Sequence, residues 1–237
     1  MSMSTRSRAV WSVSLAAALW LLGCATMPST PVPAAQPESG GIGIAVRLAP
    51  PLGPARDGEA VYFVRLDAAG QPADRTIQLS NVSRDGRLYL LNVPPGRYAA
   101  VAAHFTTMGT TYVTYLSQAA IAQTTVEVTA GGFVHAGRLS LDMGMFVCPD
   151  SADEAQLRWA EAIAPGVPKC GLVRILLHEI GTHPIMVVGG SAFTLGPSTY
   201  HYRGVLREAT RSEADLLTLA ASAREDLKDG GWSARLQ

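Results

Sequence analysis

The stretch from Arg87 to Phe105, RLYLLNVPPGRYAAVAAHF, decides the fold expected of this chain. Two runs rich in strand-forming residues flank the corner Pro94-Pro95-Gly96. Proline cannot donate to a sheet ladder, and glycine permits the backbone geometry of a tight turn. The stretch therefore predicts two strands, Arg87–Val93 and Gly96–Phe105, joined by one corner.

The same pattern extends on both sides, from Gly41 to about Met145. Short runs of Val, Ile, Tyr, Thr and Leu alternate with turn residues, and we find no helix signal between them. This spacing favours a sandwich or barrel over an α/β sheet. The further predicted strands are Gly43–Leu48, Ala60–Asp67, Thr76–Leu79, Thr111–Gln118, Thr124–Thr129 and Phe133–Leu141.

The segment Val93 to Tyr98, V-P-P-G-R-Y, resembles the corner of transthyretin-like (prealbumin-like) sandwiches. That group includes carboxypeptidase regulatory-like domains and many small bacterial lipoproteins. The resemblance covers roughly residues 43 to 142. It implies a mainly β fold, a transthyretin-like β-sandwich, and it says little about activity, because most members are accessory, adhesive or structural modules.

A change of pattern after Met145 predicts a short inserted helix. Ser151 to Glu154 fits a capping box, and Pro165 ends the helix beyond Ile163. For Leu172–Ile180 the alternation favours a strand over a short helix. Tyr200–Arg207 is a further candidate strand.

The last predicted element before the C-terminus is an amphipathic helix. Thr210 to Glu213 fits a second capping box, and Gly230-Gly231 ends the helix. Trp232–Leu236 is expected to return as an edge strand. One apolar stripe recurs at three- and four-residue steps and is expected to pack on the sandwich: Leu216, Leu219, Ala220, Ala223 and Leu227.

The N-terminus predicts export. Arg6 and Arg8 are the only charges before Cys24, and a short apolar run follows them. Leu21-Leu22-Gly23-Cys24 resembles the bacterial lipobox. The resemblance implies that residues 1–23 are removed and that Cys24 carries the acyl chains, so the lipid bilayer is the expected partner of this end. An ordinary secretory signal and an uncleaved anchor helix are the alternatives.

These features divide the chain into four expected parts. A signal peptide spans 1–23, and a lipidated Pro-rich tether spans 24–41 with a reach of about 50 Å from the lipid. The β-sandwich core covers 42–145, and a C-terminal extension covers 146–237. Ala25, in place of Asp, favours sorting to the outer membrane, so we expect a lipid-anchored protein of the cell envelope.

Two cysteines remain once Cys24 is assigned to lipid. Cys148 and Cys170 are an even pair in an oxidising compartment, so we predict a disulfide between them. Two free thiols or metal ligands are the alternatives.

Charge and motifs exclude several classes of function. The chain has 19 basic and 19 acidic residues and no basic stripe, which argues against a nucleic-acid partner. His178, Glu179 and His183 resemble the zinc-peptidase H-E-x-x-H motif with one residue too many. We find no phosphate-binding loop or nucleophile elbow, and we predict no cofactor and no catalytic residue.

Three further histidines remain: His104, His135 and His201. His135 is in phase with Phe133 and Leu139, so it is expected to face inward with a satisfied hydrogen bond. A metal site would require these histidines to converge in the fold.

The sequence therefore predicts a non-enzymatic envelope lipoprotein that binds or scaffolds. The expected partners are an envelope protein, peptidoglycan or a surface glycan. The alternative is an envelope hydrolase or metal-binding protein that uses His178, Glu179 and His183.

Overall fold

A computed structural model describes residues 30–51, 53–107, 109–171, 174, 185–188, 191–194 and 198–236. The predicted signal peptide and Cys24 lie outside this part. So does the predicted strand Leu172–Ile180 except for Arg174, whose backbone is helical and differs from that prediction. The described residues from Pro31 onward form one compact unit. No helix among the described residues is long and apolar enough to span a membrane.

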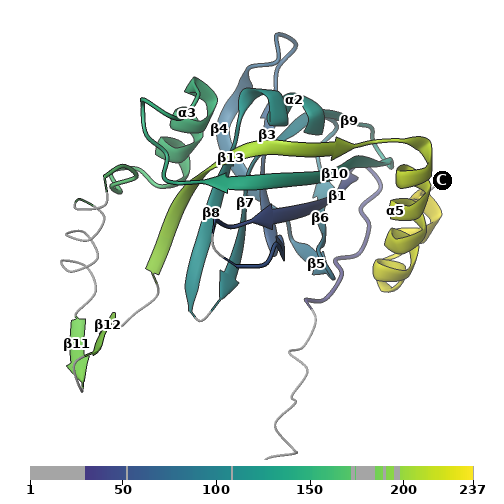
Figure 1. Ribbon diagram of the computed structural model, residues 1–237. Coiled ribbons are helices and arrows are strands. Elements are labelled where there is room, and N and C mark those ends of the chain that lie inside the picture. Colours follow the sequence, from purple (N-terminus) through teal and green to yellow (C-terminus); the bar gives the residue numbers. More distant parts are fainter. Residues whose placement is uncertain are drawn as a thin grey trace, which may run out of the picture. The chain divides into compact units, whose positions relative to one another are not determined.

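The body is mainly β and is built on one curled, mixed sheet of eleven strands (Figure 1). The order along the sheet is β4-β3-β7-β8-β13-β10-β1-β6-β5, with β2 added to β1 and β9 added to β7. The pairs β1–β10 and β8–β13 are parallel, and the other neighbours are antiparallel. The strands are β1 Gly40–Ala49, β2 Arg56–Asp57, β3 Ala60–Leu66, β4 Pro72–Leu79, β5 Val82–Arg84, β6 Arg87–Val93, β7 Gly96–Thr107, β8 Thr110–Leu116, β9 Val126–Val128, β10 Phe133–Gly144 and β13 Ser198–Thr210. A separate hairpin joins β11 Ile185–Val188 and β12 Ser191–Thr194.

The corner between β6 and β7 forms as expected. The Tyr98 hydroxyl donates to the Pro94 carbonyl at 2.8 Å, four residues upstream. The Arg65 guanidinium of β3 donates to the Pro95 carbonyl, also at 2.8 Å. Gly96 has a φ of 149°, a backbone conformation that side chains disfavour. The Tyr at the end of the motif therefore fixes the corner that the two prolines begin.

A helix interrupts the strands where none was expected. α2, Gln118–Thr124, follows β8, and the Ser117 side chain caps it by accepting a hydrogen bond from the Ala120 amide. The predicted strands Thr111–Gln118 and Thr124–Thr129 were therefore wrong at the ends that meet this helix. Alanine favours helix, and one serine cap outweighs the weak strand preference of this short segment.

The main core lies on the inner face of the curled sheet. Ile42, Ile44, Val46 and Leu48 of β1 are almost completely buried there, opposite the alternate residues of β10. This period of two buries one face of each strand and turns the intervening residues outward. We call the opposite side of strands β6, β1, β10 and β13 the outer face.

α3, Glu154–Ile163, covers part of the sheet, and its cap differs from the expected one. Asp153 is the N-cap and shares a reciprocal capping box with Gln156. The box predicted at Ser151 was wrong by two residues, because Ser151 bonds to the Cys148 carbonyl in a preceding turn. The buried Gln156 amide then donates to the carbonyls of Tyr115 and Gly204, which ties α3 to β8 and β13.

α5, Glu213–Asp226, carries the predicted apolar stripe, and Leu219, Ala220 and Ala223 are buried. Its N-cap is Ser212, so the capping box predicted at Thr210 was wrong: Thr210 still belongs to β13. The helix ends at Asp226, and the 3₁₀ turn η1, Lys228–Gly230, follows.

The last residues do not form the edge strand predicted for Trp232–Leu236. They form the 3₁₀ turn η2, Ser233–Arg235, because the Trp232 side chain is fully buried under the chain end. Trp232 joins a second apolar cluster on the outer face, with Tyr89 and Leu91 of β6, Leu227 and the partly buried Phe133.

Part of the predicted tether belongs to the body. The Trp232 indole donates to the Pro33 carbonyl at 2.9 Å, and the Arg235 guanidinium donates to the carbonyls of Gln36 and Ser39. Asn92 of β6 bonds the backbone on both sides of Ala35, which itself packs on the second cluster. The segment 32–39 is thus held by β6 and by the residues that follow α5.

Candidate functional site

The sheet register assembles a charged row across the outer face. Arg87 of β6 lies opposite Ala45 of β1, Ala45 lies opposite Arg138 of β10, and Arg138 lies opposite Thr210 of β13. Residues opposite one another in neighbouring strands share a face. Two arginines therefore flank a single alanine, with their Cα atoms about 10 Å apart, or two strand spacings.

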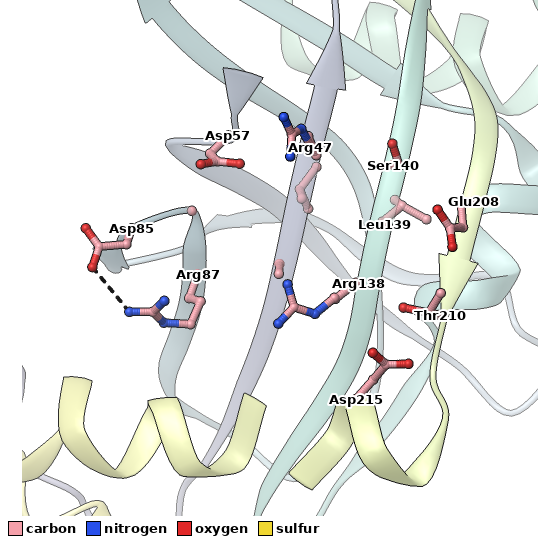
Figure 2. A pocket seen from close by; sticks show the side chains of 13 residues that line it. Arg47, Asp57, Asp85, Arg87, Arg138, Leu139, Ser140, Glu208, Thr210 and Asp215 are labelled. Atoms are coloured by element: carbon pink, nitrogen blue, oxygen red, sulfur yellow. Dashed lines mark hydrogen bonds and ion pairs between the residues drawn. The ribbon is translucent and has the colours of Figure 1, made fainter. Parts of the chain in front are cut away.

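A second row runs parallel to the first. Asp57 of β2 lies opposite Arg47 of β1, Arg47 opposite Ser140 of β10, and Ser140 opposite Glu208 of β13. Asp215, at the N-terminal end of α5, closes the side beyond Thr210 (Figure 2).

These rows line a hollow of about 380 Å³. We call it the outer-face hollow. Ala45 contributes apolar surface to its lining, and charged or hydroxyl side chains make up most of the rest. Its lining residues come from β1, β2, β6, β10, β13 and α5, with two more from the turn before β6, Asp85 and Gly86.

Arg87 is held by carboxylates. Its guanidinium donates to both Asp226 oxygens, at 2.6 and 3.0 Å, and to Asp85 at 3.4 Å. The Tyr89 hydroxyl donates to the same Asp226 at 2.5 Å. The hydrogen bond to Asp226 raises the pKa of Arg87, and burial, followed by Asp226, raises the pKa of Tyr89. Arg87 is a permanent cation that is already paired.

Arg47 and Arg138 differ from Arg87. Both side chains are exposed. Within the part of the chain that the structure describes, neither has a hydrogen bond or ion pair, whereas other arginines of the sheet do. A guanidinium presents donors in a planar fork that matches carboxylate and phosphate groups. The hollow thus contains two arginines whose donors remain available to a ligand.

Exposed carboxylates lie beside these arginines. Asp57 and Glu208 are exposed and have no ion pair among the described residues, while Asp215 accepts from the Ser212 hydroxyl at 2.5 Å. Carboxylates accept hydrogen bonds from hydroxyl groups and repel a densely charged polyanion. The lining therefore suits a ligand with hydroxyls and few acidic groups.

The three described histidines do not gather at one point. His104 bonds the Tyr62 hydroxyl at 3.2 Å, and His201 bonds the Tyr115 hydroxyl at 2.8 Å. In the described part of the chain, the single group of three potential metal ligands contains no histidine. His178, Glu179 and His183 lie outside the described residues, so the predicted alternative based on them stays a prediction.

His135 lies on the outer face, and both its ring nitrogens are buried without a hydrogen-bond partner. The satisfied hydrogen bond predicted for it was wrong. The predicted phase with Leu139 was also wrong, because the β1–β10 register shifts between His135 and Gly137 and turns Leu139 to the opposite face. Burial, followed by Arg224, lowers the pKa of His135 to about 4.

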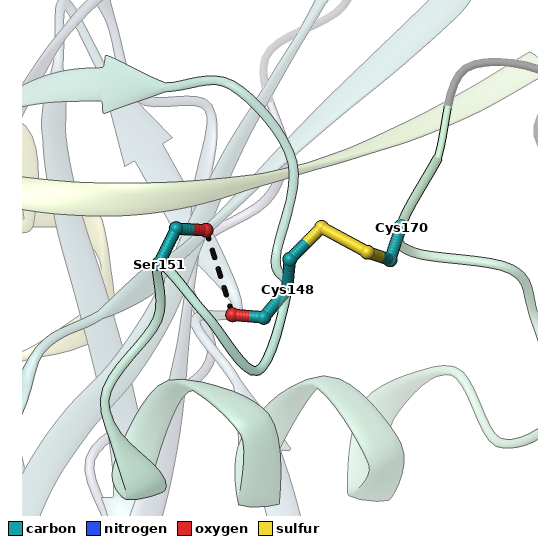
Figure 3. The surroundings of a disulfide bond; sticks show 3 residues. All are labelled: Cys148, Ser151 and Cys170. Carbon is teal, nitrogen blue, oxygen red and sulfur yellow. Dashed lines mark hydrogen bonds between the residues drawn. A yellow bond between two sulfur atoms is a disulfide. The ribbon is translucent and has the colours of Figure 1, made fainter.

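The predicted disulfide between Cys148 and Cys170 is confirmed (Figure 3). It closes a loop that contains α3, and the two Cα atoms are 5.1 Å apart. The sequence left metal ligands as an alternative for these cysteines, and the Asp150 carboxylate lies beside both sulfurs.

Comparison with known proteins adds little to this geometry. No family model and no curated protein matches the chain. One similar solved structure is that of a candidate carbohydrate binding protein from Pseudomonas aeruginosa, at 17% identity, covering 46% of this chain and 92% of that one with a TM-score of 0.22. A TM-score this low does not indicate a shared fold.

Proposed function

We propose that this chain is an exported envelope lipoprotein, anchored through Cys24, whose body binds a ligand without transforming it. The N-terminal pattern supports the anchor: two early arginines, a short apolar run and the sequence Leu-Leu-Gly-Cys. Acyl chains on Cys24 would hold the protein stably at a membrane, because each buried CH₂ contributes about 0.8 kcal/mol.

The ligand that we propose is an acidic glycan, with peptidoglycan as the probe. This choice rests on Arg47 and Arg138. Both line the same hollow, and neither has a hydrogen bond or ion pair in the described part of the chain. Their guanidinium groups fit the ligand's carboxylates, and Asp57 and Glu208 fit its hydroxyls.

For the β-rich part we propose the transthyretin-like fold that the V-P-P-G-R-Y corner implies. The hydrogen bond from Tyr98 to Pro94 gives the V-P-P-G-R-Y corner a structural role, and β6 and β7 enter and leave it as the resemblance implies. The proposed binding role does not depend on this resemblance.

Sedimentation with purified peptidoglycan tests the binding role. The full-length chain, purified in detergent, is expected to pellet with peptidoglycan, and Arg47→Ala/Arg138→Ala is expected to bind at least tenfold more weakly. A hydrogen bond to a charged group is worth about 1.5–3 kcal/mol, and 1.4 kcal/mol is about tenfold in affinity. Added salt is expected to weaken the wild-type interaction.

Arg75→Ala/Arg207→Ala is the matched control, because it removes the same charge from two exposed arginines outside the hollow. Equal loss of binding in both double variants would show that net charge alone accounts for the interaction, and it would contradict the proposed site.

The anchor has a separate test. Mass spectrometry of the chain expressed in a bacterial host is expected to show acyl chains on an N-terminal Cys24. The Cys24→Ser variant is expected to leave the membrane fraction. An unmodified Cys24 in a membrane-bound chain would contradict the lipid anchor and leave the binding test unaffected.

A further inference from the structure

The disulfide lies in a cluster with a third potential ligand. The sulfur atoms of Cys148 and Cys170 and one carboxylate oxygen of Asp150 all lie within 4.8 Å of one another. Both cysteines are partly buried, and Asp150 is exposed. None of the three residues lines the outer-face hollow.

Contacts other than the disulfide hold the Cys148 side of this cluster. The Cys148 carbonyl accepts from the amides of Ser151 and Ala152, at 3.0 and 2.7 Å, and this turn includes Asp150. The Ser151 hydroxyl also donates to this carbonyl, at 3.4 Å (Figure 3). The preceding Val147 is buried in the main core. The positions of Cys148 and Asp150 therefore do not depend on the sulfur–sulfur bond.

The Cys170 side is also held. The neighbouring Lys169 ammonium pairs with Glu161 of α3 at 3.0 Å, and its side chain is only 10% exposed. The second Glu161 oxygen accepts from the Gly166 amide at 3.2 Å. These contacts tie the segment before Cys170 to α3, so a cleaved disulfide leaves its two sulfurs near each other.

We propose that Cys148, Asp150 and Cys170 form a redox-controlled metal site that binds zinc, or a similar thiophilic divalent ion, when the disulfide is reduced. A dithiol reductant transfers two electrons and two protons to the disulfide and is itself oxidised to a disulfide. Zinc then displaces the two thiol protons and binds two thiolates and the carboxylate.

The chemistry of the three donors favours zinc. Zinc accepts thiolate sulfur and carboxylate oxygen in tetrahedral sites, with Zn–S distances of about 2.3 Å. Soft thiolate ligands disfavour magnesium and calcium, which prefer oxygen. Three protein ligands leave the fourth position to water. In the oxidised state the sulfurs bond to each other and offer no thiolate, so reduction switches the site on.

Cobalt(II) is the probe, because cobalt bound by thiolates absorbs through sulfur-to-metal charge transfer. The full chain with Cys24→Ser, which retains only two cysteines, is reduced with a phosphine that does not compete for metal. We expect one equivalent of cobalt to bind, zinc to displace it, and the oxidised chain to bind none. Cys148→Ser/Cys170→Ser is expected to bind none.

Asp150→Ala separates the proposed site from a simple pair of thiols. It is expected to weaken cobalt binding at least tenfold, while Asp229→Ala, another exposed carboxylate, leaves binding unchanged. Circular dichroism of the reduced, metal-free chain checks that the chain remains folded without the disulfide. The proposal is overturned if the reduced chain takes up no cobalt, if it unfolds, if the oxidised chain binds equally, or if Asp150→Ala binds as tightly as the parent.

Discussion

The two halves of the outer face lie on the same strands, but one is covered and the other is open. In one half, Gly41 and Gly43 of β1 leave room for the rings of Phe133, His135 and Trp232, because a Cβ on either glycine would meet them within about 3 Å. In the other half, beginning two residues further along β1, Ala45 and Arg47 line an open hollow. We call the halves the sealed half and the open half.

Side-chain size and charge explain this division. A glycine surface on β1 accepts aromatic rings, and α5 and the chain end then exclude water from them. Arginines cannot be covered in this way, because burying an unpaired charge costs several kcal/mol. The Arg87–Asp226 pair lies at the boundary and contacts both halves. The difference teaches that side chains that stabilise the fold and exposed side chains with no partner in the described part of the chain can lie along one strand.

The largest effect is expected from Trp232→Ala in the sealed half. Trp232 is fully buried, and its indole also bonds the Pro33 carbonyl. The substitution is expected to lower the free energy of unfolding by about 3–5 kcal/mol, measured by denaturant titration. Leu217→Ala is the control, since Leu217 is 65% exposed and its loss should change stability little. A loss equal to that of the control would mean that the sealed half is not a core.

The next effect is expected at the boundary between the halves. Asp226→Asn removes the charge that receives Arg87 and Tyr89, and the Asp226 side chain is only 10% exposed. We expect a loss of about 2–3 kcal/mol, the cost of leaving a partly buried cation without its partner. Asp85→Asn, at a side chain 92% exposed, should cost less than about 0.5 kcal/mol in the same measurement. Similar losses of stability in the two variants would show that Asp226 is not the main stabilising partner of Arg87 at this boundary.

His135 gives the sealed half a dependence on pH. Folding lowers the pKa of His135 from 6.5 to about 4, so the unfolded chain binds the proton more readily between these values. The contribution of neutral His135 to the free energy of unfolding is therefore expected to be fully present above pH 6.5. The free energy of unfolding should fall by about 2 kcal/mol as the pH drops to about 4, after allowance for solvent screening. His135→Phe should remove this part of the slope. An unchanged slope in the variant would assign the pH dependence to other groups, such as His104, whose pKa burial also lowers.

The sequence predicted the features that depend on local pattern. The strands on both sides of the corner and the apolar stripe of α5 follow from periodicity and turn residues, and both are confirmed. The Cys148–Cys170 pair followed from counting cysteines in an oxidising compartment.

The outer-face hollow could not be predicted in this way. Arg47 and Arg138 become neighbours only through the parallel pairing of β1 and β10, which are about ninety residues apart along the chain. The bulge at Gly137 sets which residues of β10 face outward, and alternation alone gave the wrong phase for His135. The attachment of residues 32–39 likewise depends on Trp232 and Arg235 at the other end of the chain.

That attachment changes the expected reach of the anchor. With residues 32–39 held on the body, a tether that runs from a lipidated Cys24 to Pro31 would span about 20 Å when extended. The full tether was expected to span about 50 Å. Distance measurement from a label at Arg75→Cys to the bilayer is expected to give the shorter reach in the anchored protein, and Trp232→Phe, which removes the bond to Pro33, should lengthen it. An unchanged distance in the variant would show that this bond does not limit the reach.

The smallest effect on stability is expected in the open half, where it is most informative. Arg47→Ala/Arg138→Ala removes two exposed side chains without partners in the described part of the chain, so the free energy of unfolding should change by less than about 0.5 kcal/mol. The same variant is expected to lose binding to peptidoglycan at least tenfold. Loss of stability as large as that of Asp226→Asn would show that both halves serve the fold, and the separation of stability from binding along β1 would fail.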